Sequence, residues 1–129
     1  MRLNGEEYES TIIEASNYAL TFNKLKRFAE AKKVLRKALP VARRVLGDCD
    51  ETTLRMRLNY AEALYKADGA TLDDLRKAVA TLEDTTRIAR RVLGGAHPLT
   101  SEIERDLRRS RARLRARETP QPSSPSGSV

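Results

Sequence analysis

The chain has 129 residues, of which 40% are hydrophobic and 33% charged, and it contains a single cysteine. A lone cysteine excludes an intramolecular disulfide scaffold, and no apolar run approaches the roughly 18 residues that span a bilayer. The net charge of +7 favours an acidic peptide, a nucleic acid or an anionic membrane as partner without choosing among them. The first residues turn acidic at once, unlike a secretory signal, so we expect a soluble, cytoplasmic protein.

Apolar residues that recur at spacings of three and four predict five helices. The predicted helices cover residues 10–25, 28–46, 51–67, 72–93 and 99–117. At the start of the first, Thr11 and Glu14 resemble a capping box. In the second, Pro40 predicts a kink rather than an end, because the apolar stripe continues in phase beyond it. Gly47 is the type of residue that ends such a helix.

The last two predicted helices carry start signals of their own. Thr71 and Asp74 occupy capping positions before the fourth helix, and Pro98 suits the first turn of the fifth. His97, the only histidine, precedes this proline, and we expect it to serve the helix start. The apolar stripe of the fifth helix consists of Leu99, Ile103, Leu107 and Leu114.

The hexapeptide Ala-Arg-Arg-Val-Leu-Gly occurs twice, at residues 42–47 and 89–94. The offset, 89 − 42 = 47, also superimposes Ala31 on Ala78, so the second and fourth helices are predicted copies. The first and third helices superimpose at an offset of 60 − 18 = 42, which brings Asn17 onto Asn59. The difference of five is a predicted insertion around residues 68–72, which a surface turn tolerates. A period in the forties is typical of an α-solenoid.

The pattern resembles the tetratricopeptide repeat, in the subtype found in kinesin light chains. The resemblance rests on the following segments: Asn17-Tyr18-Ala19, Asn59-Tyr60-Ala61, the two Arg-Arg-Val-Leu-Gly runs and Gly94-Gly95-Ala96-His97-Pro98. It covers residues 5–107 and implies an all-α, right-handed α-solenoid of two helix–turn–helix repeats that acts as a protein-binding scaffold. The fifth helix departs from the pattern, because Arg108 falls in the slot of Ala61 and a long cation does not fit a tight helix crossing. We therefore expect an Arg-rich C-terminal capping helix over 99–117.

The alignment also predicts the organisation of the chain. Gly5 falls in the slot of Gly47, so residues 1–9 are predicted to be a lead-in from the end of a preceding repeat. Residues 10–118 form the predicted repeat domain, and residues 119–129, rich in Pro and Ser, form a predicted disordered tail. Because solenoids need about three repeats for stability, we expect a fragment of a larger scaffold that packs against further repeats at its N-terminal end.

No catalytic set is recognisable in the sequence. One histidine and Cys49 cannot supply the four ligands of a usual zinc site, and the Gly94-Gly95 pair lacks the Lys-Ser/Thr that completes a phosphate-binding loop. We therefore expect no enzymatic activity, no metal and no cofactor.

The tetratricopeptide resemblance implies that the first helix of each repeat lines a concave groove for an extended peptide. The predicted groove residues are Asn17, Leu20 and Lys24 from the first repeat and Arg55, Asn59, Glu62 and Lys66 from the second. The two asparagines offer a donor and an acceptor to a peptide backbone, and the cations favour an acidic ligand. An alternative is that Asn17 and Asn59 only bond between neighbouring helices.

A second candidate surface is the arginine-rich end of the fifth helix. The predicted basic patch consists of Arg108, Arg109, Arg111, Arg113 and Arg115. A solvated cap, an acidic protein partner, a phosphate backbone and a nuclear address are all compatible with it. The absence of aromatic residues among the arginines weighs against base stacking. A nucleic-acid-associated protein acting through residues 105–117 is therefore the alternative function, and a purely structural scaffold segment is a third.

Overall fold

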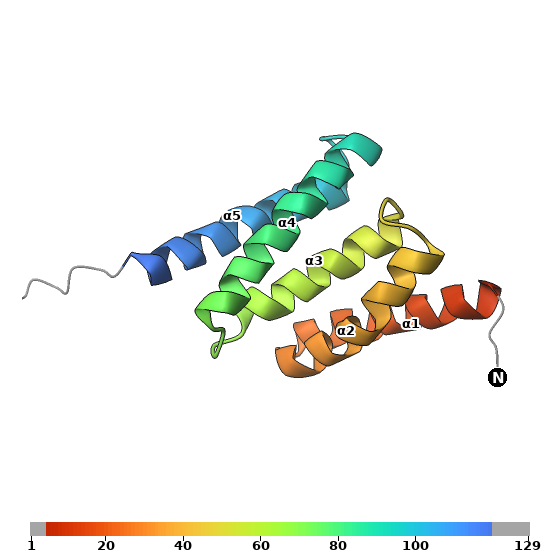
Figure 1. Cartoon of the computed structure of the whole chain (residues 1–129), viewed down its shortest axis with the longest axis horizontal. Helices are drawn as coiled ribbons and strands as arrows, with labels where there is room; N and C mark the ends of the chain where they lie inside the picture. The colour runs from red at the N-terminus through yellow and green to blue at the C-terminus, as the bar shows by residue number, and fades with distance from the viewer. Residues whose placement is uncertain (1–4, 120–129) are drawn as a thin grey trace, which may run out of the picture.

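The structure is a computed structural model that describes residues 5–119. This part of the chain contains five α-helices and no strand, as predicted for an all-α protein (Figure 1). The helices are α1 (Gly5–Lys24), α2 (Phe28–Val45), α3 (Glu51–Lys66), α4 (Leu72–Val92) and α5 (Pro98–Glu118). None of them combines the length and the apolar character needed to cross a bilayer.

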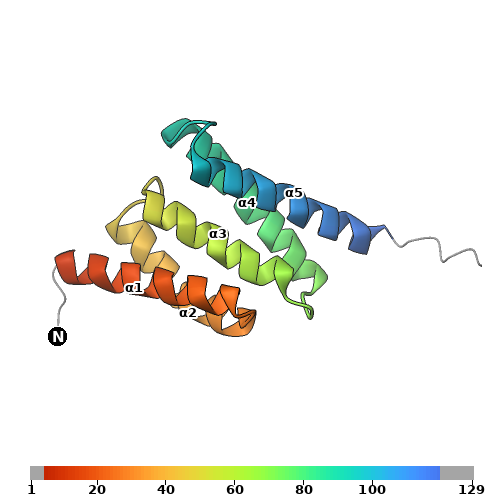
Figure 2. The ribbon, with the colours of Figure 1, turned by 180° about the vertical axis from the view of Figure 1, so that it is seen from behind.

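The helices form two layers. Helices α1, α3 and α5 lie side by side in one layer, and α2 and α4 lie in the other (Figures 1 and 2). Helix α3 is central, because it contacts each of the other four described helices, whereas α1 contacts only α2 and α3. Helix α5 contacts α4 and α3.

The predicted helix bounds agree with the structure within one residue, except at the start of α1. This helix begins at Gly5 rather than near Ser10, so the predicted lead-in is wrong for residues 5–9. The stretch contains no proline, and acidic residues such as Glu9 are favourable near a helix N-terminus. Thr11 consequently lies inside α1 and does not cap its start. Residues 1–4 and 120–129, with nearly all of the predicted tail, lie outside the described residues.

Helices α3, α4 and α5 each begin with a side-chain cap. The Asp50 carboxylate accepts a hydrogen bond from a backbone N–H at 2.8 Å. Thr71 and Asp74 form the predicted capping box, with two reciprocal hydrogen bonds of 3.0 Å. His97 Nδ1 accepts from the first turn of α5 at 3.0 Å, which confirms its predicted role. Such caps each contribute about 1 kcal/mol.

The repeated hexapeptide ends α2 and α4 in the same way. Gly47 and Gly94 adopt φ values of +91° and +92°, in the left-handed region that glycine enters without steric cost. Their N–H groups donate to the carbonyls of Ala42 and Ala89, at 3.2 Å in both cases. Both glycines therefore stop a helix, as predicted. Helix α2 continues through Pro40 without an end.

Small residues allow the helices to approach closely. Ala19 of α1, Ala31 of α2, Ala61 of α3 and Ala78 of α4 are all fully buried. The predicted apolar stripe of α5 is confirmed, since Leu99, Ile103 and Leu107 are buried and Leu114 packs against the core. Arg108, in the slot of Ala61, is exposed. Helix α5 thus covers the core with one face only.

Candidate binding surface

The predicted groove residues of α1 lie on its accessible side. Asn17 and Lys24 are exposed and Leu20 is half-buried. Asn17 lines a shallow hollow of about 240 Å³ together with Glu14, Tyr18 and Thr21, all residues of α1 itself. This hollow contains none of the predicted groove residues of α3.

The predicted groove residues of α3 are partly engaged with their surroundings. Arg55 forms an ion pair of 3.5 Å with Glu102 of α5, and Glu62 pairs with Lys66 one turn along α3, at 2.7 Å. The Arg55–Glu102 pair is largely exposed, so it contributes little to stability, whereas the Glu62–Lys66 pair is partly buried.

Asn59 does not occupy the place that the sequence predicts. It is only 3% exposed, so its amide is not offered to an extended peptide on an open surface, and that prediction is wrong. The fully buried Ala19 and Ala61 allow α1 and α3 to approach, and Asn23 Nδ2 of α1 donates to the Asn59 carbonyl at 2.9 Å. Close packing of these two helices therefore closes the groove at this slot.

The alternative role of the two asparagines is not observed either. The side chains of Asn17 and Asn59 make no hydrogen bond to any residue that the structure describes, and Asn59 Nδ2 and Asn23 Oδ1 are buried without partners. A buried amide atom without a partner costs about 1–3 kcal/mol. Asn17 and Asn59 thus hold equivalent positions in the sequence alignment but have different environments, because Asn17 is exposed and Asn59 is buried.

The arginines of α5 divide into two groups. One group binds other elements of the fold: Arg111 pairs with Glu83 of α4 at 2.9 Å, and Arg117 donates to the Ala70 carbonyl at 2.8 Å. Arg113 donates to the backbone carbonyl of Tyr65, close to the C-terminus of α3. The second group, Arg108, Arg109 and Arg115, is exposed and makes no ion pair within residues 5–119.

This division changes the meaning of the predicted basic patch. Cations are favourable near the free carbonyls at a helix C-terminus, which is where Arg113 binds, whereas Arg117 binds a carbonyl of the turn that precedes α4. These two arginines therefore hold the second half of α5 against the end of α3 and the following turn. All five arginines of the predicted patch are exposed, but Arg111 and Arg113 also bind groups of the fold.

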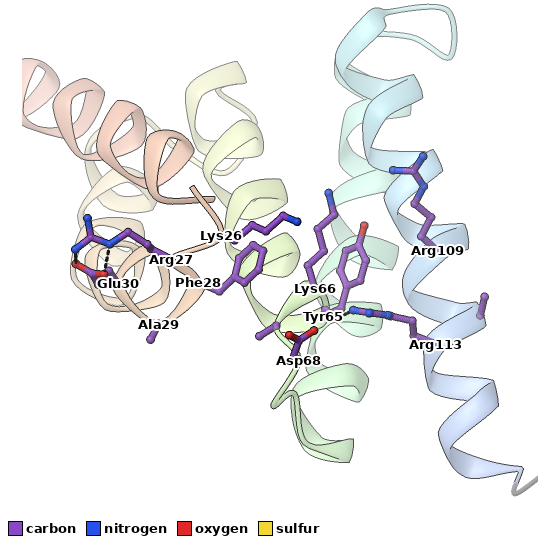
Figure 3. A pocket seen from close by; sticks show the side chains of 12 residues that line it. Lys26, Arg27, Phe28, Ala29, Glu30, Tyr65, Lys66, Asp68, Arg109 and Arg113 are labelled. Carbon is purple, nitrogen blue, oxygen red and sulfur yellow. Dashed lines mark hydrogen bonds and ion pairs between the residues drawn. The ribbon is translucent and has the colours of Figure 1, made fainter. Parts of the chain in front are cut away.

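A cleft in the described part of the chain has a volume of about 820 Å³. It lies between the α1–α2 turn, the C-terminal end of α3 and the second half of α5 (Figure 3). The residues that matter most in its lining are Lys26, Phe28, Tyr65, Lys66, Arg109 and Arg113. Lys66 of the predicted groove and two arginines of the predicted patch thus meet in one cleft.

The cleft is predominantly cationic. Five of its lining side chains are Lys or Arg and two, Glu30 and Asp68, are acidic. Glu30 is paired with Arg27 through two short contacts of 2.5 and 2.6 Å (dashed in Figure 3). Three of the cations carry no ion pair to a described residue: Lys26 on one wall, and Arg109 and Arg113 of α5 on the other.

Lys26 is held in an unusual backbone conformation. Its φ is +60°, and it is the only non-glycine residue among those described with a positive φ. The N–H groups of Lys26 and Arg27 donate to the carbonyls of Asn23 and Phe22, at 3.0 and 2.8 Å. This is the Schellman pattern, in which glycine normally occupies the left-handed position. A side chain in that position costs about 1–2 kcal/mol.

Tyr65 forms part of the cleft wall and is almost fully buried. Its hydroxyl has no hydrogen-bond partner, and burial, together with the nearby carboxyl of Asp106, raises the pKa of Tyr65 well above its usual range. Burial, reinforced by Glu62, also raises the pKa of Asp106. Burial between α3 and α5 therefore disfavours ionisation of both Tyr65 and Asp106.

Sequence reasoning missed Lys26, in the turn between α1 and α2, and Phe28, the first residue of α2, as site residues. The sequence held a signal for an unusual turn. The end of the first predicted helix and the residues after it, Leu25-Lys26-Arg27, contain no glycine, whereas the second and fourth predicted helices are followed by Gly47 and Gly94. A tight turn that lacks glycine implies a strained residue, but the direction of its side chain depends on the packing of α3 and α5.

Comparisons of the chain with protein-family models, with curated proteins and with solved structures find no match. The resemblance to the tetratricopeptide family therefore stays a prediction from the residues. Within residues 5–119 no three His, Cys, Asp or Glu side chains are close enough to hold a metal ion.

Proposed function

We propose that this protein is a protein–protein interaction module of the tetratricopeptide type, which binds an extended segment of a partner protein on the layer formed by α1, α3 and α5. The observation that carries the proposal is the 820 Å³ cleft at the edge of this layer. A cleft of this size is typical of sites that enclose part of a ligand. The module binds its partner rather than transforming it.

The arrangement of the helices supports a repeat architecture. Helices α1 and α2 form one pair, α3 and α4 form a second pair, and direct contacts between the pairs run through α3. Contacts restricted to neighbouring units are typical of solenoids. The identical ends of α2 and α4, at Gly47 and Gly94, agree with a repeated unit.

The charge of the cleft favours an acidic partner segment. Lys66 and Arg109 both line the cleft, and Phe28 adds an apolar surface. Complementary charge mainly increases association rate and specificity. The basic surface of α5 supports nucleic-acid binding less well, because Arg111, Arg113 and Arg117 already bind protein groups.

The proposal is tested by selecting peptides from a random library on the immobilised protein and measuring their affinity by fluorescence anisotropy. We expect Arg109→Glu to weaken the selected peptides at least about tenfold, equivalent to 1.4 kcal/mol. Arg115→Glu is the matched control, since Arg115 is exposed on the same helix but does not line the cleft. Equal losses in both variants, or tighter binding of an oligonucleotide than of any peptide, would contradict the proposal.

A further inference from the structure

We propose that the cleft recognises a phosphorylated serine or threonine side chain of the bound segment. The inference rests on the proposed function in one respect: the phosphate is carried by the partner segment that the module binds. The phosphate itself is inferred from the cations that lack a partner, from their positions and from the strained backbone of Lys26.

The first argument is the charge left over after internal pairing. Arg27 is neutralised by Glu30, and Lys66 by Glu62. Lys26, Arg109 and Arg113 remain without an ion pair in the described chain, since Arg113 binds only a neutral backbone carbonyl. Lys26 comes from one wall of the cleft and the two arginines come from the other (Figure 3). Asp68 is the one acidic side chain of the lining that has no ion pair.

A phosphate monoester matches this arrangement better than a carboxylate does. It carries a charge of about −1.5 to −2 at pH 7 and three strong acceptor oxygens, so it can accept hydrogen bonds from more than one cation. Arg109 can bind phosphate oxygens with two parallel N–H groups. Lys66 and Arg113 each retain N–H donors beyond those used for Glu62 and the Tyr65 carbonyl.

The second argument is the conformation of Lys26. Backbone strain at a residue persists where the surroundings determine it, and it is concentrated at ligand-binding sites. At the ends of α2 and α4 the same left-handed conformation is adopted by Gly47 and Gly94. A lysine in this position directs its ammonium group into the cleft, as Figure 3 shows, at the expense of the more favourable glycine.

The third argument is the size and lining of the cleft, which favour a side chain on a peptide over a free ion. A volume of about 820 Å³ leaves space beside a phosphate for the chain that carries it. Phe28, Ala29, Ala67 and Ala112 also line the cleft, so apolar neighbours of the phosphorylated residue have a surface to contact.

The test uses the whole protein and O-phosphoserine as the probe, with binding followed through the backbone-amide shifts in NMR spectra. We expect saturable shifts confined to the α1–α2 turn, the end of α3 and the second half of α5, and tighter binding as the pH rises through the second phosphate pKa of about 6. Lys26→Gly and Arg109→Gln should each abolish measurable binding, whereas Arg115→Gln should leave it unchanged.

Lys26→Gly also separates a binding role from a structural one. Glycine relieves the left-handed conformation, so this variant should unfold at the same or a higher temperature while it loses the probe. A lower unfolding temperature would show that Lys26 serves the fold, and would overturn its assignment as a ligand-binding residue.

Three results overturn the proposal as a whole. N-acetylglutamate shifts as large as those with O-phosphoserine would indicate a carboxylate site. A loss of binding in Arg115→Gln as large as that in Arg109→Gln would indicate unspecific attraction. Stronger competition by an oligothymidine than by O-phosphoserine would indicate a phosphodiester site. Failure of the two proposals is distinguishable. If phosphoserine binds but no peptide is selected, the proposed function fails and the phosphate site stands. If peptides bind but phosphoserine gives no response, the proposed function stands and the phosphate site fails.

Discussion

Helices α1 and α3 carry related sequences in different surroundings. At the offset of 42 that aligns them, Tyr18 corresponds to Tyr60, yet Tyr18 is 61% exposed and Tyr60 only 8%. The difference arises because α3 lies between other helices on both sides, whereas among the described helices α1 has neighbours on one side only. The environment of a slot is therefore set by what packs against it and not by the repeat pattern alone.

The residues that differ between the two helices follow this change of environment. Glu14 and Thr21 of α1 are exposed, and the residues that correspond to them in α3 are Met56 and Ala63, both fully buried. A buried slot requires an apolar side chain, whereas an exposed slot accepts a charge. The face of α1 that corresponds to the covered face of α3 is thus suited to water.

Exchanging residues between the two helices gives the largest expected effect. Met56→Glu places a carboxylate in a fully buried slot, and we expect it to lower the free energy of unfolding by at least about 3 kcal/mol. The reverse exchange, Glu14→Met, should change it by less than about 0.5 kcal/mol, because the slot is exposed. Urea denaturation measures both, and similar costs for the two variants would show that the environments do not differ as the structure indicates.

Truncating the two equivalent tyrosines is expected to give the next largest difference. Tyr60→Ala removes a buried ring that lies 5.5 Å from the Lys77 ammonium group, and we expect a loss of about 3 kcal/mol. Tyr18→Ala should cost less than about 1 kcal/mol. The measurement is again the midpoint of urea unfolding. A loss at Tyr18 as large as that at Tyr60 would mean that another surface covers α1 in solution, and sedimentation of wild type and variant would identify self-association.

Replacing Asn59, and Asn17 for comparison, should change the free energy of unfolding by less and in the opposite direction. Asn59→Leu removes a buried amide without a hydrogen-bond partner, so we expect it to stabilise the protein by about 1 kcal/mol. Asn17→Leu, at the exposed equivalent, should be close to neutral. Thermal unfolding compares the two variants. Destabilisation by Asn59→Leu would indicate that the amide is satisfied, for example by a buried water molecule.

The contact of α3 with α5 predicts the smallest effect, which depends on pH. Burial and Glu62 raise the pKa of Asp106, so the stability that this carboxyl contributes is present below the unfolded pKa of about 3.9 and is lost as the pH rises through the higher folded pKa. Asp106→Asn should therefore unfold at a higher temperature than wild type at pH 7, and the gain should disappear below pH 3.9. A gain that stays constant with pH would exclude ionisation of Asp106 as its cause.

The fold was largely predictable because its local signals agree with one another. The helix ends at Gly47 and Gly94, the capping box at Thr71 and the apolar stripe of α5 depend on residues close in sequence, and the structure confirms them. The start of α1 was not predictable from the spacing of apolar residues, since the first turns of that helix carry little apolar patterning.

The candidate site was only partly predictable, because it is formed by elements distant in sequence. Lys66 and Arg109 were assigned to two separate surfaces, and only the docking of α5 against α3 brings them to one cleft. Asn59 was expected on an open face, since its burial depends on how closely α1 approaches. Lys26 takes part because of a backbone conformation that residue type alone does not indicate.

The hydrogen bond from Arg117 to the Ala70 carbonyl has a consequence for how this chain can vary. Ala70 lies in the turn between α3 and α4, residues 67–71, which is longer than the turn between α1 and α2, residues 25–27. A deletion that shortened this turn would remove the acceptor of Arg117, and a lysine at position 117 would lack the planar guanidinium that reaches it. The length of the turn between α3 and α4 and the arginine at position 117, which is 47 positions after Ala70, are therefore coupled. A change in one requires a change in the other.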